Sequence, residues 1–240
     1  MGIYEDNAVR ELLNWQKEMT KKSGFMENLT KGAQKKINNI IPEKLHIVIT
    51  EAIKNMVKAV IFGSEYTTSS PLINQSLEIR ENMVREKIDF YKKAAAVSGA
   101  GTGGAGFLVG LADFPILLSL KMKFLFKCAS LYGFDVKDYR ERLYILYVFK
   151  LAFSSQEKRN ETFDIIKNWD IYYKTLPKDK EAFDWREFQQ EYRDYMDLAK
   201  LLQIVPGIGA VIGAYANYKL MDQLGKTAIN AYRLRVFKFN

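Results

Sequence analysis

The sequence predicts an all-α fold, in which several helices form a single bundle. Apolar residues recur at the i, i+3, i+4 spacing of amphipathic helices along most of the chain, as from Leu45 to Ile61. The sequence has no Asn-Gly or Asp-Gly turn between alternating runs and no strand–helix repeat. Two glycine-rich apolar stretches interrupt the pattern, and we expect both to be helical elements that pack together near the core.

Composition supports one globular domain over residues 1–240. Hydrophobic residues make up 48% of the chain and charged residues 27%, which excludes an intrinsically disordered protein. The 36 basic and 28 acidic residues give a net charge of +8, which favours anionic partners such as phospholipid head groups. The basic residues do not form one run, and no zinc-finger or RNP-type motif is present, so a nucleic-acid partner is not predicted.

The N-terminal part, residues 1–41, is predicted to be a basic helical segment at the periphery of the domain, with a break at Ser23-Gly24. Trp15 lies among lysines, so the segment fits either an amphipathic helix on an anionic membrane or an ordinary solvated helix. The first residues are acidic and lack an apolar core, which predicts no secretory signal. Position 6 is Asp6 rather than Ser or Thr, so the myristoylation pattern is not met.

The following elements are all expected to be helices. The first, from Leu45, has Pro42 near its first turn and Gly63 after its end. A Ser-x-x-Glu capping box begins at Ser154, and the helix that it starts is broken at Leu176-Pro177. The other expected helices are residues 72–96, 115–133, 137–153, 178–202 and 209–237.

The first glycine-rich stretch, residues 94–120, has Asp113 as its one charge, and the second, residues 201–218, has no charge. Three interpretations fit these stretches: transmembrane or re-entrant segments, a buried pair of glycine-faced helices, or a hairpin that contacts the membrane under some condition. A carboxylate inside a bilayer is costly, and Pro115 and Pro206 interrupt the runs. These features favour the buried pair.

The first stretch also matches the G-x-G-x-x-G pattern of dinucleotide-binding loops, once from Gly99 and again from Gly101. That pattern binds pyrophosphate when a strand precedes the glycines. Here a helix is expected before them, so no nucleotide cofactor is predicted. Gly225-Lys226-Thr227 resembles the end of a P-loop, but position 220 is Leu220 where the motif needs glycine.

Few side chains are candidates for catalysis. His46 is the sole histidine and Cys128 the sole cysteine, and each is interpreted as structural, with no metal site of the His/Cys kind predicted. Asp113 is interpreted mainly as a helix N-cap before Pro115. Its alternative role is an acid or base in an apolar pocket, which would make the protein a hydrolase-type enzyme acting on a lipid-like substrate.

The run SGAGTGGAGFLVGLADFPILLSL and the later run VPGIGAVIGAYANYKL, followed by an arginine-ending helix, resemble the EcsC protein family. The N-terminal run KINNIIPEKLHIVITEAIK is similar as well, so the resemblance covers nearly the whole chain. The resemblance implies an α-helical protein encoded beside an ABC transporter, with the matched positions extending to Asn217 and to Arg233 or Arg235. It carries over no catalytic residue.

Together these features predict a cytoplasmic protein at the inner face of the cell membrane, accessory to an ABC-transporter system. It would engage lipid or transporter subunits through a glycine-lined apolar site with a basic rim. The predicted site residues are Gly99, Gly101, Gly103, Gly104, Gly106, Gly110, Asp113, Phe114, Pro115, Lys121, Pro206, Gly207, Gly209, Gly213 and Asn217.

Overall fold

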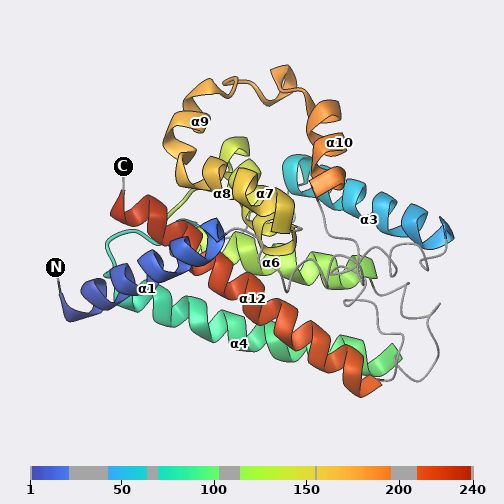
Figure 1. Cartoon of the computed structure of the whole chain (residues 1–240), viewed down its shortest axis with the longest axis horizontal. Helices are drawn as coiled ribbons and strands as arrows, with labels where there is room; N and C mark the ends of the chain where they lie inside the picture. The colour runs from blue at the N-terminus through green and yellow to red at the C-terminus, as the bar shows by residue number, and fades with distance from the viewer. Residues whose placement is uncertain are drawn as a thin grey trace.

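The computed structural model describes residues 2–21, 43–63, 70–102, 114–154, 156–195 and 210–238. Within these ranges the chain forms nine α-helices, one short 3-10 helix and no strand, which confirms the predicted all-α class (Figure 1). The elements are α1 (Ile3–Thr20), α3 (Glu43–Phe62), α4 (Leu77–Thr102), α6 (Phe114–Leu131), α7 (Tyr139–Phe153), α8 (Gln156–Lys167), α9 (Trp169–Thr175), η1 (Lys180–Ala182), α10 (Trp185–Tyr195) and α12 (Ala210–Phe237).

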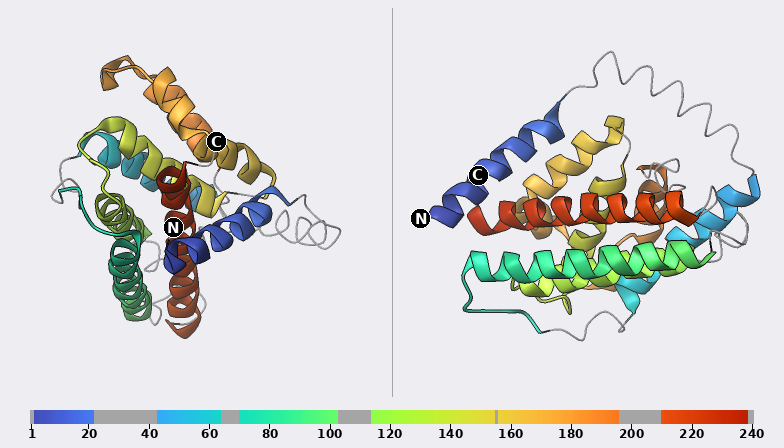
Figure 2. Two further views of the ribbon diagram at one scale, coloured as in Figure 1. Left: turned by 90° about the vertical axis from the view of Figure 1, so that its left-hand side faces the viewer. Right: turned by 90° about the horizontal axis from the view of Figure 1, so that it is seen from below.

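The two longest helices, α4 and α12, lie side by side and run antiparallel (Figures 1 and 2). Near one end Glu81 of α4 pairs with Arg233 of α12, and farther along Lys92 pairs with Asp222. Between these pairs a Cβ on Gly225 would lie 2.6 Å from Ile88 Cδ1. The absent side chain is therefore what allows the two helices to approach so closely.

Helix α6 runs antiparallel to α4 and contacts α12 as well. The Leu72 N–H, just before α4, donates to the Ser130 carbonyl at 2.7 Å, and the rings of Tyr91 and Phe124 lie 6.0 Å apart. The strongly apolar α6 is buried along most of its length. It ends at a turn in which Gly133 has a φ of +92°, the left-handed conformation that glycine adopts without strain.

Helix α7 passes through the core, and nearly all of its side chains are buried. Asp138 caps its N-terminus by accepting from the Arg140 N–H at 2.9 Å. Arg142 reaches the end of α3 and donates to the carbonyls of Ile61 and Gly63 at 2.7 and 3.0 Å. These contacts tie α3 to the body through its last turn, where backbone carbonyls lack helical partners.

An aromatic layer covers α7 on the side of α9 and α10. Tyr147 packs edge-on against Trp169, Tyr172 and Phe188. The fully buried Tyr192 donates its hydroxyl to the Leu146 carbonyl at 3.1 Å. Aromatic contacts of this kind bury much apolar area, so they hold the otherwise polar segment after α8 against the body.

The N-terminal helix α1 docks on the body through the apolar face that includes Trp15. The Trp15 ring lies 5.5 Å from Phe163 of α8, and Ala8 and Leu12 are buried beside it. In the described part of residues 1–41 this face is therefore packed against the rest of the protein. The Ser23-Gly24 break lies outside the described residues.

Two helices differ in extent from the predicted ranges. Helix α4 begins at Leu77 rather than Leu72, because Leu72 is bonded to α6 and Asn74, with a φ of 63°, turns the chain before the helix. The helix continues to Thr102 through two glycines. In the range 178–202, α10 begins only at Trp185, where Asp184 caps it by accepting from the Glu187 N–H at 2.9 Å. The helix is described as far as Tyr195.

Candidate functional site

The predicted glycine-lined site falls partly within the described residues. Gly99 and Gly101 lie in the last turns of α4, and Gly213 lies in the first turn of α12. The two helices are antiparallel, and ion pairs between them fix which residues lie opposite each other. In the same register, Gly99 of α4 lies near the level of Tyr215 of α12. The ends of both helices lie at the same end of the molecule (Figures 1 and 2).

Several predicted site residues lie outside the described ranges. Asp113 is one of them, so its proposed roles as a helix cap or as an acid or base stay predictions. The same holds for Gly103, Gly104, Gly106, Gly110, Pro206, Gly207 and Gly209.

Phe114 and Pro115 begin α6, and they differ in their surroundings. Phe114 is fully buried, whereas Pro115 is exposed beside it. Proline in the first turn of a helix costs little, because its missing N–H would have no helical partner there. The sequence motif therefore acts locally as a helix start, with one residue in the core and one at the surface.

Lys121, about two turns into α6, is fully buried in this strongly apolar helix. Its ammonium nitrogen has no hydrogen-bond partner among the described residues. Burial lowers the pKa of Lys121 to about 7, because the charged form loses its hydration. The side chain is thus a buried amine near its titration point at neutral pH, and a negatively charged group brought to it would restore its charge.

Asn217 lies close to the level of Lys121 along the helix layer. The contacts between α4 and α6 place Lys121 of α6 opposite Ala94 of α4. The ion pairs between α4 and α12 place the same Ala94 opposite Leu220 of α12, which lies one turn after Asn217. Asn217 is fully buried as well. The structure therefore brings two predicted site residues, which are far apart in the sequence, to neighbouring turns of two packed helices.

Exposed apolar side chains surround the same end of the molecule. Val97 of α4 is 72% exposed, Ile116 of α6 is 54% exposed and Tyr215 of α12 is 63% exposed. Tyr218 is also exposed, and the Lys92 ammonium lies 4.2 Å from the centroid of its ring. We call these four apolar and aromatic residues, Val97, Ile116, Tyr215 and Tyr218, the helix-end patch.

Lysines accompany the helix-end patch on all three helices. Lys93, Lys123 and Lys219 are exposed one or two turns from its members, and the Lys219 ammonium lies 5.6 Å from the Tyr215 ring centroid. The predicted basic rim is therefore carried by these residues, whereas Lys121 lies inside the protein. Aromatic rings beside flexible lysines are typical of surfaces that meet both an apolar phase and water.

The remaining catalytic candidates are Cys128 and His46. Cys128 is buried, and burial together with the charge of Glu81 raises the pKa of its thiol, so it stays protonated. His46 lies in α3. Within the described ranges no group of His, Cys, Asp and Glu side chains is arranged to hold a metal ion. Nor does any helix of those ranges combine the length and apolarity needed to span a membrane.

A buried polar network links α1, α4 and α12, and sequence analysis did not find it. Arg233 donates to both carboxylate oxygens of Glu81 at 2.7 and 2.6 Å. The hydroxyls of Tyr4 and Tyr132 donate to the same carboxylate at 2.7 and 3.0 Å. Glu11 accepts from Arg233 at 2.7 Å. Because Glu81 already has four donors, this network is structural rather than an open ligand site.

Comparison with known proteins shows the family of this chain. The EcsC protein family model matches residues 6–237, and thus nearly the whole chain. The chain belongs to the EcsC protein family. It is 46% identical over 231 residues to the protein named EcsC of Bacillus subtilis (strain 168), covering 96% of this chain and 95% of that protein.

A second relative from the same organism is an EcsC-like match at lower similarity. It is the uncharacterized protein YdbA of Bacillus subtilis (strain 168), 27% identical over 253 residues, covering 95% of this chain and 90% of that protein. No solved structure matches this EcsC-family chain. The relatives thus extend over both glycine-rich stretches and over the helices that frame them.

Proposed function

We propose that this EcsC-family protein is a membrane-peripheral accessory protein of an ABC-transporter system, and that it engages anionic lipid with its helix-end patch. The observation that carries the proposal is the set of exposed apolar side chains, headed by Val97, Ile116 and Tyr215, at the end of the molecule where α4 ends and where α6 and α12 begin. The link to a transporter rests on the resemblance described above.

The energetics favour a lipid surface over water for this patch. Moving an exposed Val or Ile side chain into an apolar phase is worth about 1.5–3 kcal/mol when burial is complete. A lysine near an anionic membrane adds about 1 kcal/mol. With three flanking lysines and a net charge of +8, charge and apolar contact act in the same direction.

Lys121 and Asn217 supply polar groups behind the patch. Lys121 has no described partner, and Asn217 is buried one helical turn from its level. An anionic head group that reached this layer would give the amine a counter-ion and raise its pKa again. In this proposal the glycines allow close helix packing, and the buried amine selects ligands with negative charge.

Vesicle flotation tests the proposal. The protein should float with phosphatidylglycerol vesicles and bind phosphatidylcholine vesicles much more weakly. The variant Val97→Asn/Ile116→Asn should lose at least about tenfold in affinity, because it removes apolar contact worth more than 1.4 kcal/mol. Ile73→Asn is the matched control, since Ile73 is 65% exposed near the opposite end of α4.

Two results would contradict the proposal. One is the absence of binding to either kind of vesicle, and the other is equal flotation of the wild type and the Val97→Asn/Ile116→Asn variant. Co-purification with transporter subunits tests the accessory role separately. If the protein co-purifies with a transporter but binds no vesicle, the patch is a protein-binding surface and the lipid proposal is wrong.

A further inference from the structure

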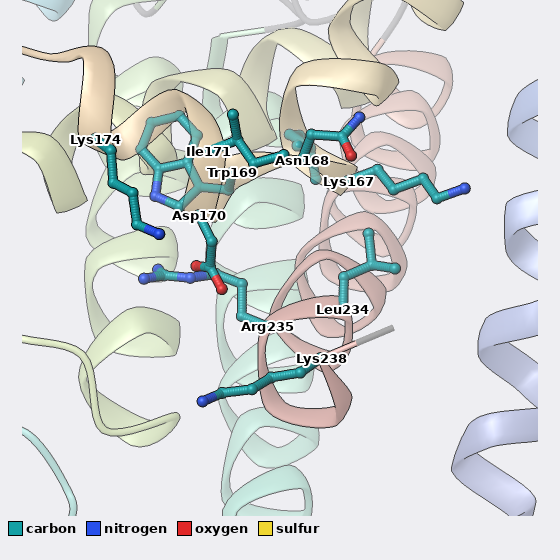
Figure 3. A pocket seen from close by; sticks show the side chains of 10 residues that line it. Lys167, Asn168, Trp169, Asp170, Ile171, Lys174, Leu234, Arg235 and Lys238 are labelled. Carbon is teal, nitrogen blue, oxygen red and sulfur yellow. The ribbon is translucent and has the colours of Figure 1, made fainter. Parts of the chain in front are cut away.

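A cavity of about 540 Å³ lies at the other end of α12, between its last turn and the α8–α9 junction (Figure 3). Basic side chains dominate its walls: Lys167, Lys174, Arg235 and Lys238, against the single carboxylate of Asp170. Its volume is in the range of small-molecule sites, which is about 300–1,000 Å³. This cavity is distant from the helix-end patch and is not part of the proposed function.

Arg235 is fixed in one orientation at the wall of this cavity. Two of its nitrogens donate to Glu141 at 2.5 and 2.7 Å, and its guanidinium lies 3.7 Å from the Phe134 ring centroid and 4.6 Å from that of Tyr144. The hydrogen bonds with Glu141 outweigh the effect of burial and raise the pKa of Arg235. The arginine therefore stays charged, and Glu141 balances that charge.

The lysines of the cavity are not balanced in this way. Lys174 and Lys238 are exposed, and neither ammonium is within ion-pair distance of a carboxylate in the described ranges. In Figure 3 the Lys174 ammonium lies beside Asp170 and Arg235, and the Lys238 ammonium lies farther along the same side of the cavity. One carboxylate faces two unpaired ammonium groups, so this side of the cavity has an excess of positive charge.

Two residues of the cavity wall also carry buried N–H donors, just behind its surface, that have no acceptor within the described residues. They are the indole nitrogen of Trp169 and the Nε of Arg235. Figure 3 shows the indole nitrogen on the side of the ring that faces Lys174 and Asp170. Buried donors are nearly always bonded in folded proteins, so these two nitrogens leave unused hydrogen-bonding capacity in the wall behind the lysines.

We infer that this cavity binds the phosphate group of a phosphomonoester. A phosphomonoester is close to doubly charged at neutral pH and offers three strong acceptor oxygens, which suits the two exposed ammonium groups of Lys174 and Lys238. The cavity is larger than a bare phosphate, and Ile171 and Leu234 give it apolar wall next to the charges. The ligand is therefore a phosphate carrying an organic group, whether a soluble ester or a phosphatidic acid head group.

Titration calorimetry on the full chain tests this inference, with glycerol 3-phosphate as the soluble probe and glycerol as the uncharged comparison. The wild type should bind one glycerol 3-phosphate per chain and no glycerol. The Lys174→Gln/Lys238→Gln variant should bind at least about tenfold more weakly, since charge-assisted hydrogen bonds are lost. Both lysines are exposed, so the variant should keep the fold, as its circular dichroism will show.

Lys58→Gln is the matched control, because Lys58 is an exposed lysine on α3, away from the cavity. Vesicles containing phosphatidic acid distinguish the two sources of phosphate. Binding to these vesicles that the double lysine variant loses, without binding of glycerol 3-phosphate, identifies a lipid phosphate and supports the inference. Binding of the soluble ester with the same dependence identifies a soluble ligand and supports it too.

The inference is overturned if neither probe binds, or if the double lysine variant and Lys58→Gln both bind as the wild type does. The Val97→Asn/Ile116→Asn variant separates this result from the proposed function. That variant should bind glycerol 3-phosphate normally, because its substitutions lie at the opposite end of α4 and α12 from the cavity.

Discussion

At the residue scale, Lys121 is an ionisable side chain that is fully buried in an apolar helix. Leaving a polar group buried without a hydrogen bond costs about 1–3 kcal/mol in proteins. A methionine has a similar length and no charge to desolvate. Lys121 is therefore a position at which stability and ligand binding are expected to act in opposite directions.

We expect Lys121→Met to raise the free energy of unfolding by about 1–3 kcal/mol near neutral pH, and to weaken vesicle binding. The pKa of Lys121 is lower in the folded protein than in the unfolded chain, so the unfolded chain binds more protons between these two pKa values. Wild-type stability should therefore rise with pH from about 7 toward the ordinary lysine pKa.

The advantage of Lys121→Met should shrink over the same pH range. Urea unfolding at about pH 7 and about pH 10 measures both effects. A destabilised variant at neutral pH would mean that the ammonium has a stabilising partner in the native protein.

Glu81 presents the opposite case, a buried charge with all of its partners. Its carboxylate is fully buried and accepts from Arg233, Tyr4 and Tyr132. The variant Glu81→Gln keeps the shape but removes the charge that compensates Arg233. Breaking a buried ion pair from one side costs about 3–5 kcal/mol, and Glu11 should recover part of it.

Chemical denaturation of Glu81→Gln measures this loss. Glu86→Gln on the same helix is the control, because Glu86 is exposed and such changes stay within about 0.5 kcal/mol. Equal stability of the two variants would show that the network does not hold α1, α4 and α12 together.

At the scale of elements, the packing of α4 on α12 explains where α4 ends. Each glycine inside a helix costs about 1 kcal/mol relative to alanine, so Gly99 and Gly101 favour an early end. The helix nevertheless continues to Thr102, beside α12. Tertiary contact therefore outweighs local propensity at this point.

The close approach at Gly225 can be tested with a double-mutant cycle. Alanine at position 225 gains helix propensity, but its Cβ would lie 2.6 Å from Ile88 Cδ1 and 2.8 Å from Cγ1, so the helices must shift or Ile88 must turn. Ile88→Val removes the Cδ1 atom. We expect the combined variant to be more stable than the two single effects predict, by about 0.5–3 kcal/mol.

Thermal and urea unfolding of Gly225→Ala, Ile88→Val and the combined variant give the coupling energy directly. Additive effects would mean that Ile88 moves aside without cost. In that case the glycine would not be required for the spacing of α4 and α12.

At the scale of the whole molecule, the two ends of the α4–α12 pair carry different surfaces. One end has the helix-end patch, and the other has the basic cavity beside α9. Both would favour anionic ligands in a protein of net charge +8. Their separation means that substitutions at one end leave the other intact.

Binding to anionic vesicles should depend strongly on salt. The screening length falls from about 10 Å at 0.1 M to about 3 Å at 1 M ionic strength, which weakens attraction between lysines and the surface. Co-sedimentation across this range should show progressive release of the protein. Binding that is unchanged at high salt would mean that apolar contact alone holds the protein, and that Lys93, Lys123 and Lys219 contribute little.

How much of the fold could be predicted differs from element to element. The range 45–61 was predicted within about two residues at each end, because its i, i+3, i+4 stripe faces one side and Gly63 follows it. The range 178–202 was predicted poorly at its start, since a charged and aromatic pattern fits a helix before and after Asp184 equally well. There the cap at Asp184 and the tilted contact between the rings of Phe183 and Trp185 decide the boundary.

The amino-acid sequence by itself determined the helical class, the family and the positions of the two glycine-rich stretches, because periodicity and motifs are local properties of the chain. Only the tertiary structure decided that Lys121 is buried while Lys123 is exposed, and that Glu81 meets Arg233. The same holds for the meeting of Lys174 with Lys238 around one cavity. These facts depend on which helix faces lie together, and contacts between distant segments leave no periodic signal in a single sequence.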